Sequence, residues 1–88
     1  MAVAFHVYIC SMTGDFYEGE CASLTLPLPD GELGVLANHS PFSAAIVPGA
    51  LRCRLPDGSV IAATVGHGLA RFAENKALVL LEQIEAKN

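Results

Sequence analysis

Residues 31–49, with the sequence GELGVLANHSPFSAAIVPG, restrict the fold of this chain more than any other segment. Two short apolar runs, at 33–37 and 42–47, flank a polar NHSP sequence at 38–41. Glycine accepts backbone angles that a side chain forbids, and Pro41 restricts both itself and the residue before it. The pattern predicts two strands joined by a tight connection that is displayed at an edge or end of a sheet. A connection of such restricted shape favours recognition of a partner over catalysis.

The rest of the chain repeats this combination of short apolar runs and turn residues. Residues 3–10 alternate with a period of two, as in a strand with one buried face. The PDG sequence at 56–58 predicts a hairpin turn, because proline presets its φ angle and glycine accepts the left-handed region. Residues 77–81 are apolar on both faces, which predicts a central strand. Further strands are expected at residues 16–17, 21–26, 33–36, 42–47, 51–55, 60–65 and 69–72.

About ten short strands, with turn signals every 8–12 residues or so, predict a single all-β domain, a β-sandwich or flattened barrel. We assign this domain to residues 1–84. The polar residues 82–88 are expected to be frayed or briefly helical, and residues 85–88 are assigned to a C-terminal tail.

Composition and charge limit the classes of partner. The net charge is −4 and the five Lys and Arg residues form no cluster, so no nucleic-acid partner is expected. The longest apolar runs are far too short to cross a bilayer, so no direct membrane insertion is expected. Apolar residues make up 52% of the chain and charged residues only 16%, against a usual value of about 25%. This balance favours an exposed apolar surface that binds a partner, although the many alanines offer a simpler explanation.

The cysteines and histidines lack the spacing of a metal site. An odd number of cysteines in a chain without an export signal predicts reduced thiols, most simply as small buried side chains. The GHG sequence at 66–68 precedes no helix and cannot cradle a phosphate, so no cofactor is expected. The residues considered are Cys10, Cys21, Cys53, His6, His39 and His67.

No arrangement of side chains supports catalysis. Ser40, His39 and Asp57 could be nominated as a triad, but the nucleophile-elbow motif is missing and the first two are adjacent in one loop. Glu18 and Glu20 lie on one side of a strand and are expected to be solvated. We therefore assign no catalytic residue and no metal ligand.

A set of short motifs continues without a gap from residue 5 to about residue 72. They are FHV at 5–7, Ser11, Phe16, Gly19, GELG at 31–34, His39, Pro41, the Pro-Gly pair at 48–49, Gly58 and GHG at 66–68. With these motifs the chain resembles the epsilon subunit of the F-type ATP synthase, which is called delta in mitochondria. The N-terminal domain of that family is a ten-stranded β-sandwich, in agreement with the number of strands expected from the residues alone.

The resemblance implies a non-catalytic rotor subunit at the foot of the central stalk, which joins the gamma subunit to the c-ring. It would couple ion-driven rotation to ATP synthesis from the cytoplasmic face of a plasma membrane, if the source is bacterial. By position, Glu32 matches the acidic residue that contacts the polar loops of the c-ring. Ser11 and His39 match positions that face gamma, and Pro41 and Phe42 are expected beside them. The apolar Phe42, with Leu36, could form the buried centre of that interface.

Two features depart from the family pattern. His67 replaces one of two adjacent glycines, so the local contact with gamma is expected to differ. Typical members also continue into a C-terminal helical hairpin, which residues 82–88 are too few to form; the sequence is either a short member or an excised domain. Two alternatives stay open: a free-standing sandwich adaptor that binds a protein or small ligand at its edges, and a hydrolase with converging carboxylates.

Overall fold

Buried and exposed side chains alternate along most strands of the chain, and this alternation builds two facing sheets. The computed structural model describes residues 4–87. In β9 (Lys76–Leu81), for example, every second side chain is buried, beginning with Ala77. Because successive side chains of a strand point to opposite faces of its sheet, each strand can offer one apolar face to a shared interior.

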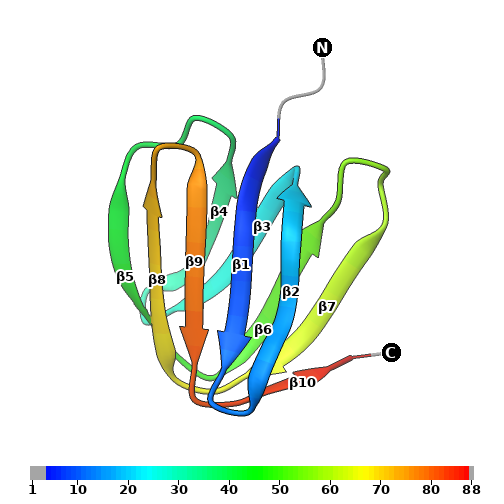
Figure 1. The fold of residues 1–88 in the computed structure, drawn as a ribbon. Helices are drawn as coiled ribbons and strands as arrows, with labels where there is room; N and C mark the ends of the chain where they lie inside the picture. Colours follow the sequence, from blue (N-terminus) through cyan, green and yellow to red (C-terminus); the bar gives the residue numbers. More distant parts are fainter. Residues whose placement is uncertain (1–3, 88) are drawn as a thin grey trace.

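Ten strands form two five-stranded sheets that pack face to face (Figure 1). The front sheet has the strand order β2-β1-β9-β8-β5, and the back sheet has the order β10-β7-β6-β3-β4. Neighbouring strands are antiparallel, apart from β1 and β9, which run parallel. The strands are β1 (Phe5–Ser11), β2 (Gly14–Cys21), β3 (Ser23–Leu28), β4 (Gly31–Leu36), β5 (Phe42–Ile46), β6 (Gly49–Arg54), β7 (Val60–Val65), β8 (Gly68–Ala73), β9 (Lys76–Leu81) and β10 (Ile84–Ala86). The expected ten-stranded sandwich is therefore confirmed.

The interior between the sheets is entirely apolar over the described residues, because no polar or charged side chain of residues 4–87 is buried there. Phe5 and Phe72 meet edge to face in it, with ring centroids 5.5 Å apart and planes at 77°. The buried residues are Phe5, Val7, Ile9, Cys21, Leu24, Leu26, Val35, Ile46, Leu51, Cys53, Ala63, Val65, Ala70, Phe72, Ala77, Val79 and Leu81.

The hairpin turn expected at the PDG sequence is present between β6 and β7. Gly58 has a φ of 93°, the left-handed value that the turn requires. Leu55 closes the turn by donating its amide to the Ser59 carbonyl at 2.8 Å. The hydroxyl and the amide of Ser59 both donate to Asp57 Oδ1, and these bonds hold the pKa of the Asp57 carboxyl below its usual value.

The strand expected at residues 21–26 is divided in the structure. β2 ends at Cys21, Ala22 forms a bend, and β3 begins at Ser23, so the chain passes there from the front sheet to the back sheet. The bend changes the phase of alternation: Cys21 and Leu24, three residues apart, are both buried. A single strand would place them on opposite faces.

The expectation of a frayed or helical C-terminal segment was wrong at residues 84–86, which form β10. β10 pairs with β7 in antiparallel register, Ile84 opposite Val65 and Ala86 opposite Ala63. Ile84 packs against the core, which fixes the strand in place. The division at residue 84 stays a prediction, and residue 88 lies outside the described residues, as does the start of the strand expected from residue 3.

Two glycines allow a matched test of this packing. A Cβ at Gly68 would lie 2.1 Å from the Leu80 backbone oxygen and 2.8 Å from a Leu81 methyl carbon, whereas at Gly34 nothing lies within 4 Å. We expect Gly68→Ala to lower the free energy of unfolding by about 2–3 kcal/mol and Gly34→Ala to change it by less than about 0.5 kcal/mol. Urea denaturation followed by circular dichroism measures both. Equal unfolding midpoints for the two variants would contradict the close packing of β8 against β9.

Candidate partner-binding surfaces

The connection between β4 and β5, at the upper end of the sandwich in Figure 1, is braced against the turn between β8 and β9. Asn38 and Asn75 both have left-handed backbone conformations, with φ of 66° and 58°. Two hydrogen bonds join the connections: the backbone amide of Asn38 donates to Asn75 Oδ1 at 2.6 Å, and Asn75 Nδ2 donates to Asn38 Oδ1 at 3.1 Å. Asparagine tolerates this conformation better than most residues, so the connection has a defined shape.

His39, Pro41 and Phe42, which the sequence assigned to gamma, come together at this upper end. The His39 ring packs edge to face against Phe42 and Phe72, with centroids 5.3 and 6.0 Å away. Its Nδ1 lies 2.7 Å from the Ser40 carbonyl oxygen. Phe42 stacks on Phe72 at 6.1 Å and is half-buried, so much of its surface is already used within the domain. Pro41 is exposed and free to contact a partner.

Ser11 lies at the other end of the front sheet. The parallel ladder of β1 and β9 runs from His6 opposite Lys76 to Ser11 opposite Leu81. Five residue steps of about 3.3 Å separate these pairs, which is roughly 16 Å. The Ser11 hydroxyl lies 2.9 Å from the Thr13 hydroxyl, within the turn that follows β1. The structure therefore does not bring Ser11 and His39 together.

Glu32 lies near the start of β4, whereas the connection that carries His39 follows the end of that strand. Its side chain is exposed at the edge of the back sheet, beside the lower turn that joins β3 to β4 (Figure 1). It forms an ion pair, in which Arg52 Nη2 lies 3.3 Å from Glu32 Oε1. Exposed pairs of this kind contribute little to stability, so Glu32 can exchange Arg52 for another cation at little cost.

An apolar patch on the outer face of the front sheet was not located by sequence reasoning. Leu69 is 62% exposed, Leu80 43% and Leu78 38%. The run at 77–81 is central in the sheet, as expected, but its alternate leucines face outward. The cross-strand pairs Leu69–Leu80 and Arg71–Leu78 hold these side chains side by side. We call Leu69, Leu78 and Leu80 the front apolar patch.

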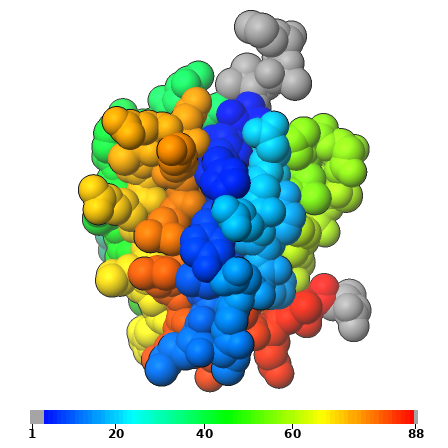
Figure 2. Space-filling model, in the orientation of Figure 1, coloured from blue at the N-terminus to red at the C-terminus, as the bar shows by residue number. Residues whose placement is uncertain are grey.

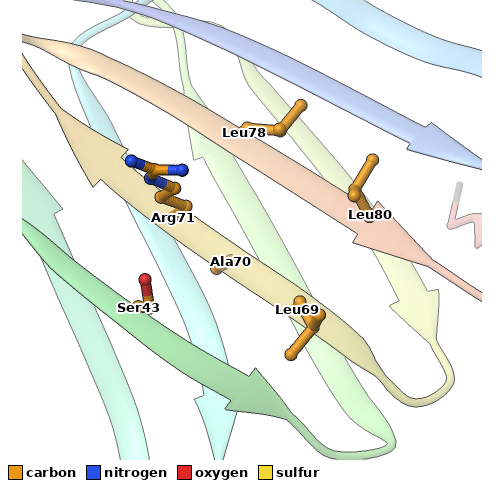
Figure 3. Close-up of a pocket in the computed structure, with 6 residues that line it drawn as sticks. All are labelled: Ser43, Leu69, Ala70, Arg71, Leu78 and Leu80. Atoms are coloured by element: carbon orange, nitrogen blue, oxygen red, sulfur yellow. The ribbon is translucent and has the colours of Figure 1, made fainter.

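The front apolar patch surrounds a shallow hollow of about 250 Å³. Figure 3 shows the three leucines around it, with Arg71 at one end and Ser43 on β5 at its margin. Figure 2 shows the outer face on which it lies, with β8 and β9 in yellow to orange beside β1 in blue. The alternating leucines and the high apolar content were the signals that could have located it in the sequence.

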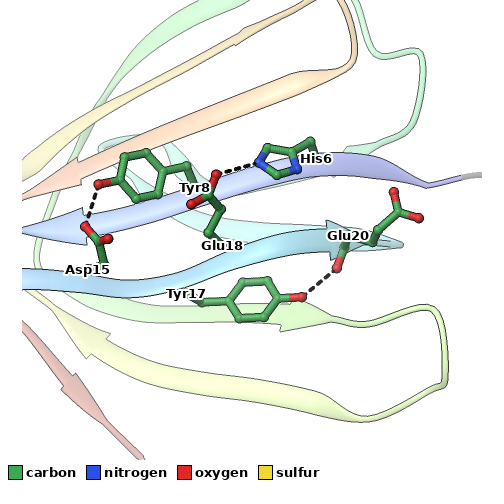
Figure 4. A network of polar contacts seen from close by, with 6 residues as sticks. All are labelled: His6, Tyr8, Asp15, Tyr17, Glu18 and Glu20. Carbon is green, nitrogen blue, oxygen red and sulfur yellow. Dashed lines mark hydrogen bonds and ion pairs between the residues drawn. The ribbon is translucent and has the colours of Figure 1, made fainter.

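Polar side chains cover the same face over β1 and β2 (Figure 4). The Tyr8 hydroxyl donates to Asp15 Oδ1 at 2.5 Å, and His6 Nε2 lies 3.1 Å from Glu18 Oε2. The bond to the Asp15 carboxylate, with smaller effects of burial and charge, raises the pKa of Tyr8 well above its usual value. This network borders the front apolar patch on the side of β1.

Potential metal ligands are scattered over the described part of the chain. Within residues 4–87, no group of three or more His, Cys, Asp or Glu side chains could hold a metal ion. No carboxylate lines the front hollow, and Glu18 supplies the one carboxylate that lines a second hollow beside it. The hydrolase alternative needs several converging carboxylates. Over the same residues, no helix has the length and apolar character needed to span a membrane.

Comparison with known proteins relates nearly the whole chain to one family. The family model described as "ATP synthase, Delta/Epsilon chain, beta-sandwich domain" matches residues 4–87. The ATP synthase epsilon chain of Dichelobacter nodosus is 31% identical over 83 residues, which are 94% of this chain and 58% of that protein. The chloroplastic ATP synthase epsilon chain of Piper cenocladum is 35% identical over 79 residues, 88% of this chain and 59% of that protein.

A solved structure shares the fold at lower identity. One chain in a structure of the Euglena gracilis mitochondrial ATP synthase that includes the c-ring superposes with a TM-score of 0.90 at 17% identity, covering 96% of this chain and 54% of that one. This similarity supports the sandwich architecture. The chain spans somewhat less than three fifths of the two curated relatives named above.

The two tyrosines of the chain provide a test of the polar network. The carboxylate of Asp15 raises the pKa of Tyr8, and burial raises that of Tyr17, so neither should ionise near the ordinary value of about 10. In a Tyr17→Phe background, we expect Asp15→Asn to lower the pKa of Tyr8, measured by the absorbance of tyrosinate during alkaline titration.

The raised pKa of Tyr8 makes the stability of the folded chain depend on pH in the alkaline range. Tyr8 favours its neutral form in the folded state, so its contribution is complete below the pKa of the unfolded chain and is lost as the pH rises through the folded value. Asp15→Asn should remove this alkaline loss. An unchanged Tyr8 titration in the Asp15→Asn variant would mean that the bond to Asp15 does not form in solution.

Proposed function

Because this chain belongs to the family of ATP synthase delta/epsilon chain β-sandwich domains, we propose that it is a non-catalytic subunit of the central stalk of an ion-translocating ATP synthase. It joins the gamma subunit to the polar loops of the c-ring, so that rotation of the ring reaches the catalytic head. The match of the family model to residues 4–87 is the observation that carries this proposal. Since the chain spans 58–59% of the relatives, the proposal concerns the role of the sandwich.

A subunit of this kind needs a stiff body and two separate contact surfaces rather than reactive groups. The continuous sheets and the apolar interior support the first requirement. Glu32 lies at the edge of the back sheet and the front apolar patch lies on the front sheet, and this placement supports the second requirement. We place the domain in a peripheral part of a membrane-associated complex, and in a bacterium this part would lie at the cytoplasmic face of the plasma membrane.

We assign the front face of the sandwich to gamma. Ser11 and His39 lie at opposite ends of the front sheet, so a partner that touches both must cross the sheet between them. The front apolar patch lies on that path and can form the water-excluding centre of the interface. Exposed Arg71 and Lys76 lie on the same face and can form a charged rim. Permanent interfaces bury about 2,000 Å² or more, which the patch alone is too small to provide.

We assign Glu32 to a contact with a basic loop of the c-ring. The carboxylate is exposed, and the adjacent Gly31 turn and the β3–β4 ladder hold its backbone in a fixed position. Arg52 supplies a weak internal partner that can be exchanged on assembly. An exposed charge pair of this type contributes more to the choice and register of the partner than to affinity.

The gamma surface is tested by placing charge in the front apolar patch. We expect Leu69→Glu with Leu80→Glu to weaken binding of purified gamma at least about thirtyfold, which corresponds to about 2 kcal/mol. Isothermal titration calorimetry measures the affinity, and circular dichroism checks the fold. Val60→Glu is the matched control, because Val60 is 49% exposed and lies in the back sheet. If the double variant and the control bind gamma equally well, the assignment of this surface is refuted. If the parent chain binds neither gamma nor synthase membranes, a free-standing adaptor is favoured.

The c-ring contact is tested by reversing one charge. We expect Glu32→Lys to leave gamma binding unchanged and to reduce retention of the c-ring by the assembled stalk about tenfold, because the new cation repels a basic loop. Retention is measured by quantitative mass spectrometry of detergent-purified complexes. Glu85→Lys serves as the control, since Glu85 is exposed on the opposite edge strand of the same sheet. Loss of the ring in both variants, or in neither, would remove the special role of Glu32.

A further inference from the structure

Two cysteine thiols meet inside the sandwich. Cys53 Sγ lies 2.9 Å from Cys21 Sγ, and both side chains are completely buried. Cys21 ends β2 in the front sheet, and Cys53 lies in β6 of the back sheet. The contact between the two sulfur atoms therefore spans the interior and touches both layers.

The backbone around the pair holds the thiols in this relation. Cys53 is opposite Leu24 in the β3–β6 ladder, and the Ala22 amide donates to the Arg54 carbonyl at 2.7 Å. These bonds link the bend after Cys21 to the strand that carries Cys53. A disulfide has a sulfur–sulfur distance of about 2.05 Å, so the two atoms need to approach by only about 0.9 Å.

We propose that Cys21 and Cys53 are a site of reversible oxidation, at which reaction with a low-molecular-weight disulfide produces an intramolecular disulfide that joins the two sheets. Because both thiols lie in the interior, this inference does not depend on the proposed function of the outer surfaces. Cys10 takes no part in this reaction, because its side chain points away from the interior. Every second residue of β1 from Phe5 to Ile9 is buried, whereas Cys10 lies beside Leu80 on the outer face of the sheet.

The reaction is a thiol–disulfide exchange in two steps. The Cys21 thiolate attacks one sulfur of the low-molecular-weight disulfide and releases one small thiolate, leaving a mixed disulfide on Cys21. The Cys53 sulfur then attacks Cys21 Sγ and releases the second small thiolate. The two protons of the protein thiols are taken up by the two leaving thiolates. In sum, the protein dithiol loses two electrons and two protons, and the small disulfide becomes two thiols.

The structure indicates which cysteine reacts first and how it becomes accessible. The hydrogen bond from Cys53 lowers the pKa of the Cys21 thiol, whereas the same bond and burial raise the pKa of Cys53. The thiolate is the reactive form, so Cys21 is the attacking group. It ends an edge strand, next to the bend at Ala22, so local opening requires the separation of β2 from β1 and the loss of the bond from the Ala22 amide to the Arg54 carbonyl. We expect oxidation to be slow and to accelerate in urea below the unfolding transition.

The test uses the purified chain and glutathione disulfide as the oxidant. After oxidation, the chain is denatured, treated with iodoacetamide without a reductant, and weighed by mass spectrometry. The reduced parent should take up three alkyl groups, one for each cysteine of the sequence, and the oxidised parent should take up one, at Cys10. A Cys10→Ser variant should take up none after oxidation and should weigh two hydrogen atoms less than its reduced form. Its melting temperature should rise by about 10 °C and return when dithiothreitol is added.

Single-thiol variants are the matched controls. Cys10→Ser combined with either Cys21→Ala or Cys53→Ala should show no intramolecular disulfide and no rise in melting temperature on oxidation. The proposal is overturned if Cys21 and Cys53 of the parent chain stay open to alkylation after oxidation in low urea. It is equally overturned if the disulfides join separate chains or involve Cys10, or if the linked chain melts at a lower temperature than the reduced one. The number of free thiols in the oxidised parent chain tests the proposal even if a variant with Cys21 or Cys53 replaced fails to fold.

Discussion

The contact between the inner faces of the two sheets is the interaction on which the rest of the structure depends. Most strands offer alternate apolar side chains to one interior layer, and Phe5 meets Phe72 within it. Burial of this apolar surface is the main favourable contribution to folding, and a chain of 88 residues has little of it to lose. The inner residues are therefore tightly restricted, while the outer residues of the same strands are free to serve a partner.

The outer surface shows how that freedom is used. Leu69, Leu78 and Leu80 remain in water although the domain does not need them for its core. Exposing a group of large apolar side chains is unfavourable for an isolated chain, and such patches commonly mark interfaces. The braced connection at one end and the acidic edge at Glu32 complete a body with separate contact regions. This arrangement agrees with the proposed role of a part that transmits movement between two partners.

Local signals in the sequence predicted much of the fold but only part of the candidate site. The PDG turn, the period-two strands and the central position of β9 follow from neighbouring residues alone, and each is present. The division between β2 and β3 at Ala22 was missed, because Cys21 and Leu24 fit one apolar run until the chain changes sheets. β10 was missed because a three-residue strand with polar neighbours is formed by its pairing with β7, which no local pattern encodes.

The sequence by itself determined which residues alternate, where the chain turns and how many strands result, because these depend on the conformational preferences of adjacent residues. Tertiary structure alone decided which face of each strand is covered. It left Leu78 and Leu80 in water, placed Ser11 and His39 at opposite ends of one sheet, and brought Cys21 to Cys53 across the interior. Each of these facts depends on pairing between segments far apart in the chain, and the energy of that pairing belongs to the assembled sheets rather than to any single segment.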